Sequence, residues 1–316
     1  MKSIRKWSYL AALLLVSCQQ NVVSDFTHSD SLELSLQASI TGKVMSKTST
    51  DTDGRTVFVE GDKIGLFMEG EDTPSLWTSE GGNWKPETPL YWPDQENNYD
   101  FCAFYPYVEG AVRSHVIMPD LSRQEGRLET VGKWDFLAAF KNCNYESAEG
   151  KVSFTGESSF KHVYSLVMVT LVKNENDAET SLNTICFEGK DILTPHYYDF
   201  TANKMIKETE APESSLLELV TEEGSTIPEE GYSVAVLLNP VAMESPLKFS
   251  ITYERDAFLY EASTESMAST LEGGHCYKYK VRIEKEGLIL EGSEVSDWQT
   301  DGGVGDIIVN DVPAEE

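Results

Sequence analysis

The sequence predicts an all-β protein, and three observations carry this prediction. From residue 31 onward, short segments alternate apolar and polar side chains, which is the period of a β-strand. Turn-forming residues separate most of these segments, and helical periodicity is confined to one turn at most, near residues 216–220. Strands that follow one another without helices indicate β-sandwiches rather than a parallel sheet. The expected strands cover residues 32–40, 56–60, 63–68, 99–105, 115–118, 136–140, 163–172, 232–238, 247–253 and 276–284.

The first of these strands has the clearest pattern. Its alternate apolar residues are Leu32, Leu34, Leu36, Ala38 and Ile40, and the residues between them are mostly polar. One face of such a strand lies against a core while the other faces solvent. We therefore expect a half-buried strand at the start of the folded chain.

Aromatic residues gather in two segments, residues 89–93 and 99–107. Aromatic faces bind sugar rings, so one interpretation is a sugar-binding platform. The other is a sandwich core, because each buried aromatic ring removes about 150 Å² or more from water. We favour the core.

A polar stretch that ends in glycine, residues 145–150, is the expected boundary between two domains. The glutamate-rich residues 208–230 are expected to form a solvated loop inside the second domain. The chain is therefore divided into a lipoprotein signal peptide (1–17), an N-terminal β-sandwich domain (18–150), a C-terminal β-sandwich domain (151–300) and an acidic, glycine-rich tail (301–316).

The composition excludes one class of function. The chain has 316 residues, with 53 Asp and Glu against 25 Lys and Arg, and a formal net charge of -28. This length is sufficient for two domains with cores of their own. A surface this acidic repels polyanions, so we exclude nucleic acid as a partner.

The first residues have the form of an export signal. The basic residues Lys2, Arg5 and Lys6 precede an apolar run over residues 7–16, and the sequence Leu-Val-Ser-Cys then ends at Cys18. The run is about half of the roughly 20 residues that a membrane-spanning helix needs. Leu-Val-Ser-Cys resembles a bacterial lipobox, which implies cleavage before Cys18 and a lipid on its thiol. The alternative is an ordinary cleaved signal with an incidental cysteine.

The sequence contains no recognisable catalytic motif. Its five histidines are dispersed, and the patterns HExxH, GxSxG, GxGxxG and the Walker loop are absent. The cysteines Cys102, Cys143, Cys186 and Cys276 lack CxxC spacing and are expected to act as buried small apolar side chains, with a disulfide as the alternative. We therefore expect neither an enzyme nor a cofactor.

A fragment of a calcium-binding pattern occurs at residues 49–60. Asp51, Asp53 and Glu60 stand at the third, fifth and twelfth positions of an EF-hand loop, but Ser49 occupies the position of the first aspartate. No helical pattern flanks the segment. Its content of serine, threonine and glycine favours an exposed polar loop, so no metal is expected.

Several short motifs follow one another in a fixed order along the chain. They are GDKIGLF (61–67), LYWPD (90–94), YDFCAFYP (99–106), DFLA (135–138), FKH (160–162), LVMVTL (166–171), YKYKV (277–281) after Gly274, and DW (297–298). In this order the motifs resemble those of the Mfa-like fimbrillin family, the type V pilus subunits of Bacteroidales, over nearly the whole mature chain.

The resemblance implies a fold of two transthyretin-like β-sandwich domains. It also implies export as a lipoprotein, attachment to the outer membrane through lipid on Cys18, and assembly with other fimbrial subunits into surface fimbriae. Such fimbriae mediate adhesion to a ligand on a host or bacterial surface. The motif residues themselves are expected to serve the fold, with Gly61 and Gly65 flanking a turn and Phe160 and Trp298 acting as core or interdomain anchors.

The resemblance further implies a role for the first strand. In type V pilins this strand is lost to proteolysis, and an extended strand of a neighbouring subunit fills the open groove. The candidate cut sites here are Lys43, Lys47 and Arg55, with Arg55 favoured over Lys47, and residues 307–309 are a candidate donor. Two alternatives stay open, a permanent first strand and a surface glycan-binding lipoprotein of the same architecture.

Overall fold

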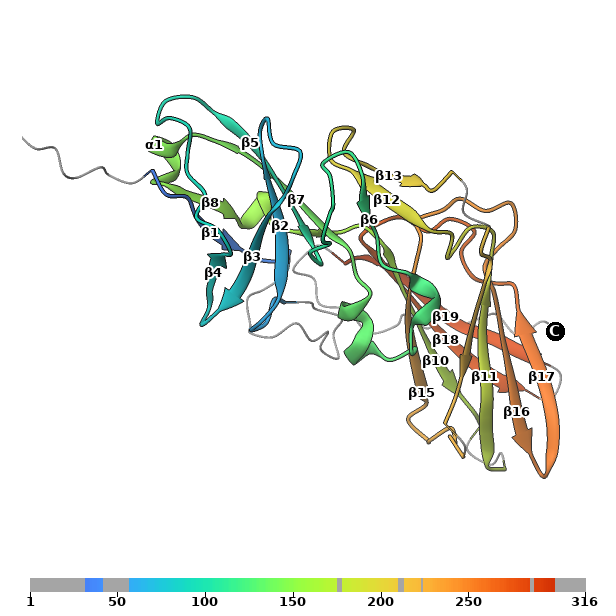
Figure 1. The fold of residues 1–316 in the computed structure, drawn as a ribbon. Helices are drawn as coiled ribbons and strands as arrows, with labels where there is room; N and C mark the ends of the chain where they lie inside the picture. The colour runs from blue at the N-terminus through green and yellow to red at the C-terminus, as the bar shows by residue number, and fades with distance from the viewer. Residues whose placement is uncertain are drawn as a thin grey trace, which may run out of the picture. The chain divides into compact units, whose positions relative to one another are not determined.

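The computed structural model describes residues 32–41, 57–174, 178–209, 213–222, 224–284 and 287–298. These residues form strands β1 to β19 and a single short α-helix, α1 (Tyr145–Ala148), so the predicted all-β class is confirmed. Figure 1 shows the strands arranged in several sheets joined by loops and short 3₁₀ turns.

A six-stranded antiparallel sheet is the largest sheet among the described residues before residue 163. Its order is β4 (Asn83–Pro86), β3 (Ser75–Glu80), β2 (Lys63–Met68), β5 (Tyr99–Tyr105), β7 (Leu137–Cys143) and β9 (Lys161–His162). Gly65 in β2 leaves room for a neighbouring ring, because a Cβ atom there would lie 2.2 Å from Cε1 of Phe104. The sheet therefore packs aromatic side chains directly against its own backbone.

Two four-stranded sheets follow in the second half of the chain. The first has the order β15 (Tyr232–Leu238), β10 (Ser165–Val172), β18 (His275–Glu284) and β19 (Gly287–Asp297). The second has the order β14 (Leu216–Val220), β11 (Thr180–Glu188), β16 (Lys248–Arg255) and β17 (Phe258–Thr264). Buried side chains from both sheets belong to one hydrophobic cluster, as expected of a β-sandwich.

Two smaller sheets complete the described residues. One contains β13 (Lys204–Lys207), β12 (His196–Asp199) and β6 (Val116–Ile117), all antiparallel. The other contains β1 (Ser35–Ala38) and β8 (Lys151–Phe154), which pair in parallel although about 115 residues of chain separate them.

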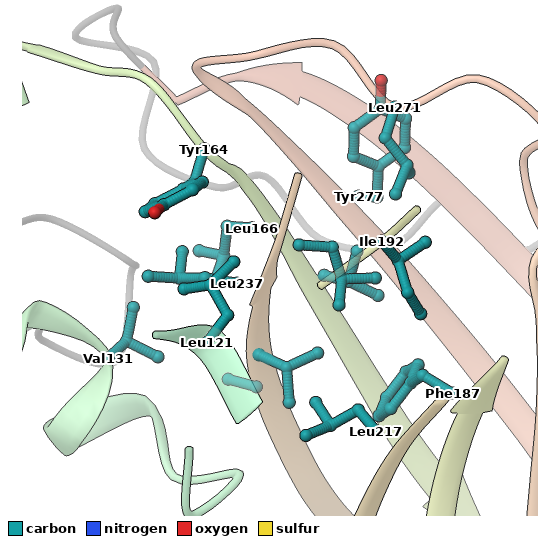
Figure 2. Close-up of a cluster of buried hydrophobic side chains, with 14 of the residues drawn as sticks. Leu121, Val131, Tyr164, Leu166, Phe187, Ile192, Leu217, Leu237, Leu271 and Tyr277 are labelled. Atoms are coloured by element: carbon teal, nitrogen blue, oxygen red, sulfur yellow. The ribbon is translucent and has the colours of Figure 1, made fainter. Parts of the chain in front are cut away.

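The buried side chains form two clusters. One, which we call the slot core, combines the N-terminal strand with the six-stranded sheet and β8. The other extends across residue 150, and Figure 2 shows Leu121 and Val131, which belong to the 3₁₀ helices Leu121–Arg123 and Leu128–Lys133, in the same cluster as Leu166 and Leu237. The division into two domains at residue 150, at 18–150 and 151–300, stays a prediction.

Residues 145–150 form a structured turn. Asn144 caps α1, its side-chain oxygen accepting a hydrogen bond from the Ser147 N–H at 2.8 Å, and Glu149 then takes a left-handed conformation with φ of 50°. The chain thereby reverses and enters β8, which pairs with β1.

Several local expectations are wrong. Residues 57–60 form no strand, because the Asp62 carboxylate accepts a hydrogen bond from the Val59 N–H at 2.6 Å and holds a turn. Gly65 lies inside β2 and does not flank a turn. Residues 216–220 form β14, which replaces the expected helical turn and interrupts the solvated loop expected over residues 208–230. In β14 Leu217 and Leu219 are buried while their neighbours are exposed, which is the period of a strand.

Candidate functional site

The N-terminal strand, residues 32–41, lies in a slot at the edge of the slot core. Its central part is β1, which pairs in parallel with β8 from Ser35↔Lys151 to Ala38↔Phe154. Outside β1, the Leu34 N–H donates to the Leu90 carbonyl at 2.7 Å, and the Trp92 N–H donates to the Leu32 carbonyl at 2.8 Å. Backbone hydrogen bonds therefore hold the strand over its whole described length.

The side chains of the strand alternate as predicted. Leu34, Leu36 and Ile40 are 2%, 6% and 4% exposed, whereas Glu33 and Ser35 are exposed. Full burial of a Leu or Ile side chain contributes roughly 1.5–3 kcal/mol, so these three contribute about 5 to 9 kcal/mol as an upper value. The strand is half-buried, and its apolar face is a wall of the core.

The remaining walls of the slot come from other elements. Without the strand, the slot core would lose one of its apolar walls, and proteins avoid leaving large apolar patches uncovered. The buried members of the slot core outside the strand are Ile64, Leu66, Met68, Trp77, Trp92, Phe101, Ala103, Leu137, Ala139, Cys143, Val152, Phe154 and Phe160.

The strand is attached to a strand along only one of its edges. Among the described residues, β1 has one hydrogen-bonded strand neighbour, β8. Its other edge is hydrogen-bonded near residues 90–92, and β1 also lies close to β4. Residues 42–56, which connect the strand to the six-stranded sheet, lie outside the described residues.

The aromatic segments belong to the core, as favoured from the sequence. Trp92 is 2% exposed, and its indole N–H donates to the Gly150 carbonyl at 3.2 Å. Phe101 lies 5.1 Å from Trp92 between ring centroids and is also buried, whereas Tyr91 is half-exposed. Trp92 and Phe101 are therefore packed inside the slot core, and neither presents a free face to a sugar ring.

The four site residues predicted from the sequence, Cys18, Lys43, Lys47 and Arg55, lie outside the described residues. The candidate donor, residues 307–309, and the first part of the calcium-like pattern, residues 49–54, lie outside them as well. Glu60, the last residue of that pattern, is exposed and accepts a hydrogen bond from the Gly81 N–H at 2.8 Å. Within the ranges that the structure describes, no group of three or more His, Cys, Asp or Glu is arranged to hold a metal ion.

Three of the four remaining cysteines are buried. Cys102, Cys143 and Cys276 are 4%, 8% and 0% exposed, Cys186 is partly exposed, and all four are free thiols. Burial raises the pKa of each of the four thiols, in the case of Cys276 to about 12. The expectation of buried, small apolar side chains is met at three positions and only in part at Cys186.

One buried polar cluster combines residues from three of the sequence motifs. His162 Nδ1 lies 2.5 Å from Asp135 Oδ2, and both side chains are essentially inaccessible. The imidazole stacks on the indole of Trp298, with ring centroids 3.6 Å apart and planes within 9°. The sequence motifs contain each of these three residues. Their contact could not be predicted from local sequence, because His162 and Trp298 are 136 residues apart in the chain.

In the part of the chain that the structure describes, no helix has the length and apolar character needed to cross a membrane.

Comparisons with a family model, with a sequence relative and with solved structures agree with one another. A sequence model described as fimbrillin-like matches residues 47–298. The "Putative fimbrium subunit Fim1C" of Bacteroides uniformis is 22% identical over 260 residues, which is 78% of this chain and 80% of the relative.

Solved structures agree on the fold. A "putative cell adhesion protein" from Bacteroides uniformis superposes with a TM-score of 0.58 at 18% identity, covering 85% of this chain and 99% of that structure. A fimbrial protein from Bacteroides vulgatus superposes with a TM-score of 0.54 at 14% identity, covering 84% and 99% of the two chains.

Proposed function

Because the chain belongs to the fimbrillin-like family, we propose that it is a subunit of a cell-surface fimbrium and takes part in cell adhesion. The names of the similar proteins, a fimbrium subunit and a cell adhesion protein, support this proposal. The proposal includes a fold of two transthyretin-like sandwich domains and assembly with other fimbrial subunits as partners. Electron microscopy of surface fibres on cells with and without this chain tests it, and unchanged fibres that contain none of the chain would contradict it.

We propose further that the subunit assembles by strand exchange at the slot of the N-terminal strand. The observation that carries this proposal is an N-terminal strand with three buried apolar side chains, whose central part, β1, forms a ladder with β8 as its one strand partner among the described residues. An extended segment of another subunit with the same alternation of side chains would satisfy the free backbone groups of β8 and refill the slot core. The donor in this scheme is the tail, with residues 307–309 as its apolar centre.

Removal of the strand requires one cut between residues 42 and 56. This segment contains Lys43, Lys47 and Arg55, and we propose Arg55 as the main site, in preference to Lys47. N-terminal sequencing of the chain recovered from fibres tests the step. A chain that starts just after one of these basic residues supports exchange, and a fibre-bound chain that still starts at Cys18 rules it out for this subunit.

Lipid on Cys18 is the proposed anchor of the precursor in the outer membrane. A single acyl chain gives only marginal membrane affinity, so stable attachment needs the several chains that a bacterial lipoprotein cysteine carries. Metabolic labelling with a fatty-acid analogue should label the wild-type protein and leave a Cys18→Ala variant unlabelled. Absence of label on the wild-type protein would contradict the lipid anchor without affecting the fimbrial proposal.

A further inference from the structure

Residues 159–164, which we call the bridging segment, contact both the N-terminal strand and the end of β19. The segment contains β9 and leads into β10. Its attachment to the six-stranded sheet is short, since β9 pairs with β7 at only two positions, Leu137↔His162 and Ala138↔Lys161. One further backbone hydrogen bond, from the Val163 N–H to the Phe136 carbonyl at 3.0 Å, extends this attachment. Phe160, His162 and Tyr164 are buried, so the contacts of these side chains also set the position of the segment.

The first part of the bridging segment holds the end of the N-terminal strand. The Thr41 N–H donates to the Phe160 carbonyl at 2.9 Å, and the Phe160 N–H donates to the Ser39 carbonyl at 2.9 Å. The hydroxyls of Thr41 and Ser159 lie 2.7 Å apart. Phe160 is fully buried in the slot core together with Ile40. The strand and this part of the segment therefore fix each other.

The last part of the bridging segment holds Trp298. The His162 ring stacks on the indole, and the Asp135 carboxylate fixes the orientation of that ring. The backbone N–H of Trp298 donates to the Gly274 carbonyl, and the backbone N–H of Gly274 donates to the Tyr164 carbonyl, both at 2.8 Å. Trp298 is 7% exposed and is the last described residue before the tail. The chain is therefore held at Trp298, three residues before the tail begins at residue 301, by contacts with the same segment.

We propose that the bridging segment couples the N-terminal strand to the start of the C-terminal tail. While the strand occupies its slot, Phe160 is fixed and His162, two residues later, holds Trp298 in its buried site. Loss of the strand removes the hydrogen bonds to Ser159 and Phe160, and the segment then releases Trp298 more readily. This inference deepens the proposed function, on which it rests, because it makes the tail available as a donor only in a subunit whose own strand has been removed.

The coupling is reciprocal by thermodynamic necessity. Any contact through which the strand stabilises the site of Trp298 also lets Trp298 stabilise the docked strand by the same free energy. Couplings between sites in proteins typically change an equilibrium by about 5- to 150-fold. Two matched experiments on the isolated, unassembled mature protein can therefore test it in both directions.

The first experiment compares Ile40→Ala with Leu34→Ala by amide hydrogen exchange. Both variants truncate a buried apolar side chain of the same strand, but only Ile40 lies next to Phe160. We expect Ile40→Ala to accelerate exchange of residues 293–298 by roughly fivefold or more and Leu34→Ala to leave it within about twofold. Unchanged exchange of residues 293–298 in Ile40→Ala, with exchange of the strand accelerated, would overturn the proposal.

The second experiment runs in the opposite direction. Trp298→Ala should accelerate exchange of residues 39–41, whereas Leu288→Ala, which truncates a buried side chain at the other end of β19, should not. Thr41→Val provides a milder variant that keeps the fold, since it removes only the hydroxyl contacts to Ser159 and Phe160. Equal effects of Trp298→Ala and Leu288→Ala on the strand would overturn the coupling. Because no readout involves fibres, failure here is distinct from failure of the fimbrial proposal.

Discussion

Two strand edges in this molecule are covered by segments that belong to no large sheet. The edge of β8 is covered by the N-terminal strand, which pairs with it through a regular parallel ladder. The edge of β15 is covered by residues 124–126. There the side-chain Nε2 of Gln124 donates to the Leu237 carbonyl at 2.8 Å, and its side-chain Oε1 accepts from the Leu237 N–H at 2.6 Å. The Gly126 carbonyl accepts from the Ala235 N–H at 3.0 Å.

The two covers differ in how they are tethered. Residues 124–126 lie in the chain between β6 and β7, so one cut beside them leaves them attached at the other end. The N-terminal strand is joined to the body of the fold only through residues 42–56, so one cut there leaves it held by non-covalent contacts alone. The N-terminal strand makes more regular backbone pairing than residues 124–126, yet it is the segment that a single cut can free. The extent of hydrogen bonding therefore does not decide which segment can be replaced.

The largest effect is expected from a charge placed in the slot. Leu36→Asp puts a carboxylate at a position that is 6% exposed, and expulsion of the strand is the least costly way to hydrate it. We expect amide exchange of β8 to accelerate by about a hundredfold or more, equivalent to about 2.8 kcal/mol, while far-UV circular dichroism shows a folded β protein. Ser35→Asp, at the neighbouring exposed position, is the matched control and should leave exchange nearly unchanged.

A smaller effect is expected at the cover of β15. Gly126 has φ of +74°, and a Cβ atom there would lie 2.6 Å from Leu219 Cδ1 and 2.9 Å from Val234 Cγ2. Gly110 has the same φ with no atom within 4 Å of that position. Both alanine substitutions lose about 1 to 2 kcal/mol to backbone strain, and Gly126→Ala should lose roughly 1 to 3 kcal/mol more through overpacking. Equal urea midpoints for the two variants would show that this cover moves freely.

Replacement of Gln124 tests the side-chain hydrogen bonds that cover the edge of β15. Gln124→Ala leaves the Leu237 N–H and carbonyl without the partners that they have in this structure, which costs about 1 to 3 kcal/mol for a buried donor or acceptor. Gln124→Glu keeps an acceptor for the N–H but loses the donor for two carbonyls, so it should also destabilise near neutral pH. Since a protonated glutamic acid can donate again, the loss in Gln124→Glu should shrink as the pH falls. A pH-independent loss in urea unfolding would contradict this account of the pairing.

The comparison also separates what the sequence could predict from what it could not. Alternation of apolar residues from Leu32 to Ile40 sufficed to predict a half-buried strand, because burial on one face follows from a local period. Its partner could not be found in this way, since β8 lies about 115 residues away and pairing depends on the assembled fold. The aromatic core was predictable for the same reason as the strand, because large apolar rings at alternate positions are seldom left in water.

Polar residues with structural roles were harder to predict. Gln124 is buried although glutamine is ordinarily a surface residue, and its role depends on an exposed strand edge that forms elsewhere in the chain. His162 and Trp298 were singled out by motifs, yet their stacking joins distant segments. The turn at residues 145–150 was seen as a boundary because its composition is polar, and the same composition also forms the capped helix that returns the chain to β8.

The smallest effect concerns the reactivity of Cys143, which shares the slot core with the N-terminal strand. Burial raises the pKa of this thiol, so in the docked state almost none of it is the reactive thiolate near neutral pH. If the strand leaves, the thiol becomes hydrated, its pKa falls toward the ordinary range, and both thiolate fraction and access increase. Alkylation of Cys143 should therefore accelerate by roughly tenfold in Leu36→Asp.

Cys276 is the internal control, since it is inaccessible, has a pKa of about 12 and belongs to the other core cluster. Cys186 is partly exposed and should react first in every variant. Mass spectrometry of the alkylated peptides measures all three rates together, and parallel acceleration of Cys143 and Cys276 would mean that the slot and the second core open as one unit.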